Sequence, residues 1–176
     1  MIKACELPDT ALLRKYLGMG AFCDCYAAEI ALPVSHAEFV EAFYTTWVFK
    51  LERTLLALFV SRPSSDAQAQ ALARGESDKF AAWHVEGRTT DQLLLCDFQG
   101  RTRSWLMSAT DVGNVSPATR LYFGSAVVPV DDPRSGRKSL GLVFRALLGF
   151  HKLYSRVLLR AALLRLSRSR PAGARP

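Results

Sequence analysis

The sequence lacks a long hydrophobic run, and this absence sets the first limits on its class. No stretch of the 176 residues reaches the ~18 uncharged apolar residues of a membrane span, and no apolar run follows the opening MIKACELPDT. We therefore expect no spanning helix and no cleaved signal peptide, and the expected compartment is the cytoplasm. With 49% hydrophobic residues, the chain can nevertheless bury a core, which excludes disorder of the whole chain.

Motifs of metal and nucleotide chemistry are also missing. The sequence has four cysteines without C-x-x-C spacing and three histidines without a repeated carboxylate spacing. It contains no G-x-S-x-G, Walker or dinucleotide-binding fingerprint. We therefore expect no metal site and no cofactor, and we expect reduced, mostly buried thiols.

Acidic residues are absent from the C-terminal quarter. Residues 133–176 contain 11 Lys/Arg and no Asp/Glu, whereas residues 1–132 contain 12 basic against 16 acidic residues, a net charge of −4. Such asymmetry favours an anionic partner, either a membrane surface, a nucleic acid or an acidic protein. Nucleic acid is disfavoured because the tail RLSRSRPAGARP has no interleaved aromatic residues. The alternative is a solvated basic helix face with nothing bound.

Periodicity and turn signals predict helices and one strand in the first half of the chain. PDTALLRKYL reads as a short helix capped by Asp9 or Thr10, and FCDCYAAEIAL reads as the first strand. The capping box SHAE opens one or two helices over residues 36–60, with a break expected at TTWV. A second capping pattern, from Ser65 to Gln68, starts the small helix DAQAQALAR.

The second half is predicted to contain strands and then one long helix. KFAAWHVEGRT, DQLLLCDFQ, RTRSWLMSAT and TRLYFGSAVVPV have the composition and length of strands. Their short links favour an antiparallel meander. Residues 139–168 form the longest helical segment, so we expect one domain over residues 1–168 and a basic flexible tail over residues 169–176.

The long helix is predicted to be amphipathic. At about 100° per residue, the basic residues fall on one stripe and the apolar residues fill the other side. The apolar side comprises Phe144, Leu147, Phe150, Leu153, Tyr154, Val157 and Leu158, and the basic stripe comprises Arg145, Lys152, Arg156 and Arg160. We expect burial on the sheet up to about Leu159. Leu163, Leu164, Leu166 and the following arginines should then overhang the sheet and meet any anionic membrane.

The predicted order of elements specifies an α+β fold, in which an antiparallel sheet grips a long C-terminal helix and further helices follow the first strand. This order, with GRTRSWL, TRLYFGSAVVP and FRALLGFHKLYSRVLLRAAL, resembles the START-like, or helix-grip, superfamily over about residues 20–165. Within that superfamily, the sequence pattern is most similar to bacterial members for which no activity is implied. The resemblance implies a cavity for an apolar or amphipathic molecule between sheet and helix. The count of about five strands is lower than that superfamily's six or seven.

The hairpin QLLLCDFQGRTRSWLMS poses the question of whether its polar residues form a site. An even-length turn places Leu93, Leu95, Asp97, Ser104 and Leu106 on one face, where Asp97 would point inward and be satisfied by Thr102 or Ser104. The arginines would then face outward. An odd-length turn would instead let Asp97 meet Arg103 across the ladder. Either outcome is sufficient for structure without chemistry.

Two histidines complete the candidate site. His84 shares a face with Phe80 and Glu86 and lies in the cavity or is exposed at a sheet edge. His151 lies within the apolar arc of the long helix, and Tyr154 lies on the same side. The pair would line a cavity under that helix, or His151 would be a buried histidine satisfied by a backbone carbonyl.

Two functions follow from these residues. The first is binding of a small hydrophobic or amphipathic ligand by a carrier or sensor, with a ligand site of Asp97, Ser104, His151, Tyr154, Phe144, Leu147 and His84. The second is an enzyme of cyclase, dehydratase or hydrolase type, in which Asp97, His84 or His151 moves protons and the three groups converge on one substrate. A peripheral membrane role for the basic C-terminal segment is a further alternative.

Overall fold

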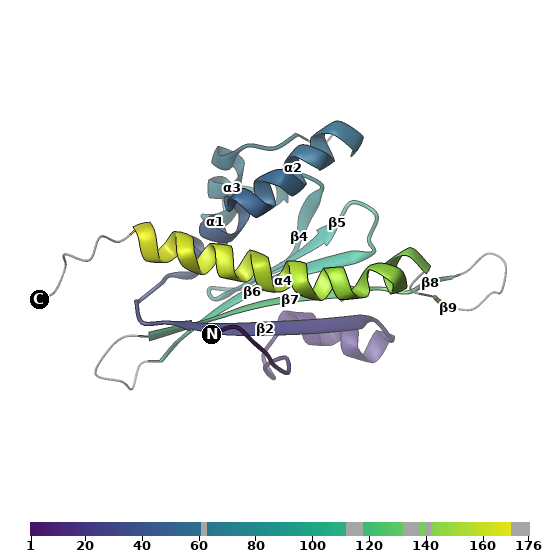
Figure 1. Cartoon of the computed structure of the whole chain (residues 1–176), viewed down its shortest axis with the longest axis horizontal. Coiled ribbons are helices and arrows are strands. Elements are labelled where there is room, and N and C mark those ends of the chain that lie inside the picture. The colour runs from purple at the N-terminus through teal and green to yellow at the C-terminus, as the bar shows by residue number, and fades with distance from the viewer. Residues whose placement is uncertain (61–62, 112–117, 132–137, 140–141, 170–176) are drawn as a thin grey trace, which may run out of the picture.

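The computed structural model describes residues 1–60, 63–111, 118–131, 138–139 and 142–169 (Figure 1). It is an α+β fold in which a seven-stranded antiparallel sheet, in the order β1-β2-β7-β6-β5-β4-β3, packs against the long helix α4. The elements are β1 (Lys3–Ala4), η1 (Leu12–Met19), β2 (Phe22–Ile30), α1 (His36–Tyr44), α2 (Trp47–Val60), α3 (Asp66–Ala73), β3 (Lys79–Phe80), β4 (Trp83–Arg88), β5 (Gln92–Asp97), β6 (Thr102–Asp111), β7 (Ala118–Val127), β8 (Val130–Asp131), β9 (Lys138–Ser139) and α4 (Leu142–Ser169). Of the tail predicted over residues 169–176, Ser169 is the last residue of α4, and residues 170–176 lie outside the described residues.

The helices inserted after β2 begin where their capping signals predict. Ser35 accepts a hydrogen bond from the amide of Glu38, whose side chain accepts from the Ser35 amide, and Ser65 and Gln68 repeat this arrangement at the start of α3. The chain breaks between α1 and α2 at two buried threonines, Thr45 and Thr46, as the β-branched TTWV predicted. Local sequence therefore sets these boundaries.

The β5–β6 hairpin has the even-length register. Leu93 pairs with Leu106 and Leu95 with Ser104, so these side chains share the α4 face of the sheet. Oδ1 of Asp97 accepts the backbone amide of Arg101 at 2.7 Å, rather than a hydroxyl of Thr102 or Ser104 or the side chain of Arg103, as the two turn alternatives expected. Asp97 is thus a turn residue that secures the hairpin bend.

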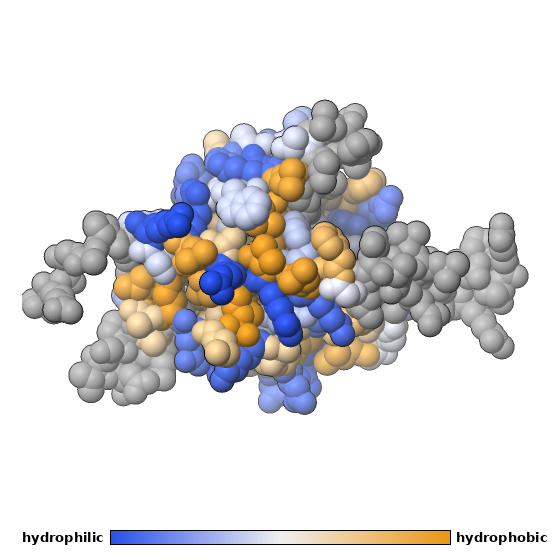
Figure 2. All heavy atoms as spheres, viewed as in Figure 1, coloured by the Kyte–Doolittle hydropathy of each residue, from blue (hydrophilic) through white to orange (hydrophobic). Residues whose placement is uncertain are grey.

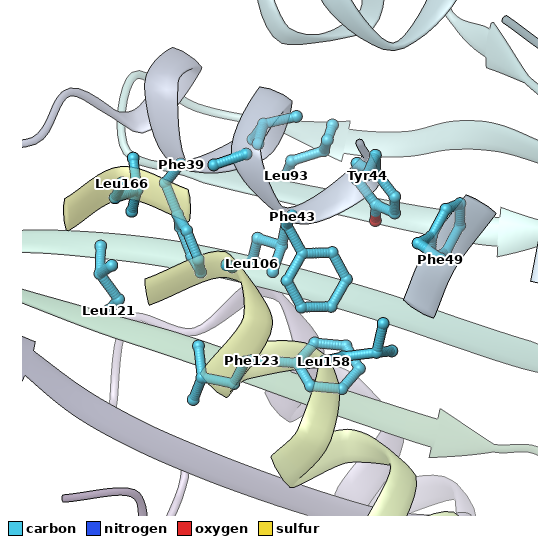
Figure 3. Close-up of a cluster of buried hydrophobic side chains, with 14 of the residues drawn as sticks. Phe39, Phe43, Tyr44, Phe49, Leu93, Leu106, Leu121, Phe123, Leu158 and Leu166 are labelled. Carbon is cyan, nitrogen blue, oxygen red and sulfur yellow. The ribbon is translucent and has the colours of Figure 1, made fainter. Parts of the chain in front are cut away.

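The main core lies between the sheet, α1 and α4. Figure 3 shows Phe39 and Phe43 of α1 together with Leu106, Leu121 and Phe123 of the strands, and Leu158 of α4 joins them. Each fully buried side chain of this kind contributes about 1.5–3 kcal/mol relative to exposure. This core fills one end of the space under α4.

The opposite face of the sheet is also covered, which sequence reasoning did not predict. Leu13 and Tyr16 of η1 pack against Leu94, Trp105 and Met107 in a second core, and Trp105 is fully buried. The preceding strand β1 was likewise missed, and η1 follows Ala11 without the side-chain cap expected from Asp9 or Thr10.

Arg103 illustrates the consequence, because it was expected to face outward and instead lies beneath η1. Its Nε donates to Glu86 Oε2 and to the Tyr16 hydroxyl, both at 2.7 Å. Burial alone raises the pKa of Glu86, but hydrogen bonds from Lys15 and Tyr16 and the charge of Arg103 lower it to about 2. This network holds η1 on the sheet.

The packing of α4 differs from the prediction along its length. Leu166 is buried with Leu158, Leu159 and Ala162 and does not face solvent as predicted, whereas Leu164 is exposed as predicted. Phe150, Leu153 and Val157, which were expected to be buried on the sheet, are also exposed. The reason is that α1 packs against α4 and covers its C-terminal half, a contact that the helical period of α4 could not predict. Within the described ranges, no helix has the length and hydropathy needed to cross a membrane.

Candidate functional site

A pocket of about 490 Å³ opens between the sheet, α2 and α4. Figure 1 shows α4 in front of the sheet, running in roughly the same direction as β2 and β7, with α2 above it in this view. The lining residues are Phe43, Trp47, Val48, Phe49, Leu51, Trp83, Thr102, Arg103, Ser104, Phe123, Ser125, Phe150, His151, Tyr154, Ser155 and Leu158. Most of these side chains are apolar or aromatic, and the polar ones gather on the sheet and on one turn of α4.

The strand register builds a polar row into the wall of the pocket. Asp24 of β2 pairs with Ser125 of β7, and Ser125 pairs with Ser104 of β6, so the three side chains stand side by side on the α4 face. One level further along the strands, the corresponding residues are Tyr26, Phe123 and Leu106. The alternation of the strands thus sets one polar level beside an apolar core level.

His151 of α4 lies over this row and contacts two of its side chains. Ser125 Oγ donates to Asp24 Oδ1 at 2.6 Å and lies 2.8 Å from His151 Nε2, while Asp24 Oδ2 lies 3.5 Å from the same nitrogen. Because a serine hydroxyl has one proton and gives it to Asp24, Ser125 accepts from His151 Nε2–H. The side chain of Asp24 is only 9% exposed, so this network is largely removed from water. It fixes the tautomer and orientation of His151.

The geometry of this trio is not that of an activated serine. In a Ser–His–acid triad, serine and acid contact opposite nitrogens of the imidazole, and the histidine accepts the serine proton. Here both contact Nε2, and the serine proton is committed to the carboxylate. Across the residues that the structure describes, no group of three His, Cys, Asp or Glu side chains is arranged to hold a metal ion. The arrangement is suited to hydrogen bonding with a bound molecule.

A second hydrogen bond and a ring stack complete the walls. The hydroxyl of Tyr44, at the end of α1, lies 3.0 Å from Ser104 Oγ. Tyr154 stacks on Phe150 with ring centroids 5.9 Å apart and an interplanar angle of 12°. At the opening, Trp47 of α2 is 73% exposed and Phe150 of α4 is 64% exposed. The mouth of the pocket is therefore as apolar as its interior.

Three of the residues predicted as a ligand site line this pocket, namely Ser104, His151 and Tyr154. His84 does not, because it is exposed and pairs with Cys96 on the η1 face of the sheet. Asp97 serves the hairpin turn and is not among the lining residues. The structure therefore does not bring His84, Asp97 and His151 together, as the enzyme hypothesis required. The side chains of Phe144 and Leu147 lie outside the described residues.

Asp24 and Ser125 were missed in the sequence. The signal for Asp24 was present, because this acid occupies the same strand face as Tyr26, Ala28 and Ile30, all of them buried. A carboxylate on a core-facing strand position indicates a specific partner. Only the register of β2 against β7 identifies that partner as Ser125.

Comparisons with models of protein families, with curated proteins and with solved structures found no match.

Proposed function

We propose that the protein binds a small amphipathic molecule in the pocket between the sheet, α2 and α4. The observation that carries this proposal is an open, largely apolar pocket of about 490 Å³ with a polar row on one wall. Ligand sites typically have about 300–1,000 Å³ and combine apolar walls with a few convergent polar groups. The resemblance to START-like proteins supports the same use of the space under the C-terminal helix.

The chemistry of the walls defines the class of ligand. Phe43, Phe49, Phe123 and Leu158 offer apolar and aromatic contacts to a hydrocarbon or ring body. Ser104 and Ser125 each keep a lone pair on the hydroxyl oxygen that can accept a hydrogen bond from one polar end, such as a hydroxyl group. A ligand that lacks a polar end forgoes this additional hydrogen bond. The pocket therefore favours molecules with a polar end over pure hydrocarbons.

Occupancy of the pocket is tested by filling it. Thr102 lines the pocket on β6, and Thr110 lies eight residues further along the same face of the same strand, where it is exposed. Thr102→Phe should reduce affinity for the neutral probe N-phenyl-1-naphthylamine by at least about tenfold, whereas Thr110→Phe should leave it unchanged. Equal probe affinity in the two variants would refute this site.

Recognition of the polar end is tested with a matched pair of competitors. We expect 4-butylphenol to displace the probe at about tenfold lower concentration than butylbenzene, which has the same body without the hydroxyl. Ser104→Ala and Ser125→Ala should each reduce that preference while leaving butylbenzene unaffected. Native mass spectrometry of gently purified protein provides an independent measurement, since a bound amphipathic molecule adds its own mass. A preference for butylbenzene in the wild-type protein would contradict the assignment of the polar row.

A further inference from the structure

The outer face of α4 carries an apolar stripe that faces solvent. Phe150, Leu153, Val157 and Leu164 are all exposed, although they lie on the side of α4 away from the buried Leu159 and Ala162. Their spacing of three, four and seven residues places them in one row along the helix. A helix packed on a sheet normally presents charged residues on this side. The row therefore represents apolar surface that no described part of the chain covers.

Helix α2 extends the apolar surface beside this row. Trp47 and Leu51 are exposed, and both lie with Phe150 around the mouth of the pocket. Trp47 also lines a second pocket, of about 480 Å³, with Leu164, Arg165 and Arg168. We refer to the six exposed residues Trp47, Leu51, Phe150, Leu153, Val157 and Leu164 as the apolar rim. Figure 2 shows hydrophobic residues gathered on this face between strongly hydrophilic ones.

Basic residues border the rim on both sides. Lys152, Arg156 and Arg160 are exposed along one flank of α4, and Arg165 and Arg168 are exposed near its C-terminal end. The whole of α4 contains no acidic residue. Two copies of this face would repel each other, because each places several positive charges next to the surface that would have to be buried. The charge pattern favours an anionic partner.

We propose that the apolar rim docks the protein on an anionic lipid surface, with the mouth of the pocket turned toward the lipid. Amphipathic surfaces of this kind insert aromatic and aliphatic residues among the headgroups, while Lys and Arg attract anionic lipids. Tryptophan is enriched at such interfaces. The membrane surface thus keeps Leu164 and the arginines predicted at the C-terminal turns, omits the buried Leu166, and extends to the mouth of the pocket. An amphipathic molecule would then enter the pocket directly from the bilayer surface.

Vesicle sedimentation of the full chain tests the docking. Binding to phosphatidylcholine vesicles that contain phosphatidylglycerol should be at least about tenfold tighter than to phosphatidylcholine alone, and salt should weaken it because exposed charges are screened. Leu153→Ser with Leu164→Ser should reduce binding by about tenfold or more. Neither residue lines the pocket, so binding of the naphthylamine probe should persist in this variant.

A matched pair of charge variants separates the rim from the overall charge. Lys152→Glu with Arg160→Glu reverses two charges beside the rim, and Lys3→Glu with Lys79→Glu reverses two exposed charges on the edge strands. The first variant should lose most binding to anionic vesicles and the second should retain it. Equal losses would show that only net charge matters and would overturn the proposal.

Trp47 reports the orientation directly. Brominated lipids should quench its fluorescence in the bound protein, and Trp47→Phe should remove most of that quenching, because Trp47 is 73% exposed whereas Trp105 is fully buried and Trp83 is only partly exposed. A truncated chain ending at Ser169 should still bind. Binding that disappears on truncation, or an exposed rim that proves to mediate self-association in analytical ultracentrifugation, would refute lipid docking. Failure on vesicles with intact probe binding would refute the docking alone and leave the pocket proposal standing.

Discussion

Acidification should destabilise the fold through His36, the first residue of α1. Burial, as the largest cause, lowers the pKa of this imidazole from 6.5 to about 4; the charge of Asp91 opposes the shift and that of Arg88 adds to it. Nε2 of His36 is buried and, among the described residues, has no hydrogen-bond partner. The folded protein thus holds His36 neutral at a pH where the unfolded chain protonates it.

The direction and size of the effect follow from this difference. Because the pKa is depressed on folding, the contribution to stability is complete above about pH 6.5 and is lost as the pH falls toward about 4. Each pH unit across this window corresponds to about 1.4 kcal/mol, so the full effect is about 3 kcal/mol. Between about pH 7.5 and 5, the loss should be about 2 kcal/mol.

Guanidinium denaturation at these two pH values measures the effect. His36→Asn removes the titrating group and retains a polar atom near Ser108 Oγ, which lies 3.4 Å from His36 Nδ1. The variant should lose about 2 kcal/mol less than the wild type on acidification, whatever its stability at neutral pH. The difference isolates His36 from the other titrating groups. Parallel pH dependence of the two proteins would refute this account of the buried imidazole.

Two further predictions concern the hydrogen bonds of Gln92 and the space around two glycines. Gln92 is buried, and its Oε1 accepts hydrogen bonds from the Leu12 amide and the Trp105 indole, each at 2.9 Å. Gln92→Met should therefore lower the free energy of unfolding by about 2–5 kcal/mol in urea denaturation. A loss below about 1 kcal/mol would contradict the importance of these two hydrogen bonds. A Cβ at Gly124 would lie 2.9 Å from a neighbouring backbone oxygen, so Gly124→Ala should destabilise by about 1–3 kcal/mol. At Gly149, where nothing lies within 4 Å, the same change should stabilise α4 by about 0.5–1 kcal/mol, and equal melting shifts for the two variants would contradict the difference in packing.

Local signals were sufficient for much of the fold. The capping boxes at Ser35 and Ser65 place helix starts within one turn of chain, because donor and acceptor lie three residues apart. Strand alternation in residues 92–107 predicted the hairpin but left an even- and an odd-length turn open, and the structure has the even-length one, which keeps Leu93, Leu95 and Leu106 on one buried face. The helix starts and the hairpin itself depend on contacts between residues close in sequence.

The candidate site was predicted only in part, because some of its residues meet through contacts between distant segments of the chain. His151 and Tyr154 share a helix face with apolar residues, so the helical period alone placed them over the sheet. Asp24 and Ser125 are 101 residues apart and meet only because β2 returns beside β7. No local pattern encodes that pairing, and Asp24 therefore could not be assigned a partner.

The sequence by itself determined an antiparallel sheet with a long amphipathic C-terminal helix, because periodicity and caps are read from neighbouring residues. Tertiary structure alone decided which surfaces of those elements are covered. It buries Trp105 under η1 and Leu166 in the main core, yet leaves Phe150 and Leu153 exposed, although all four are large apolar or aromatic residues. The choice depends on which distant segments supply contacts, and these segments cover the far end of α4 and leave the pocket mouth open.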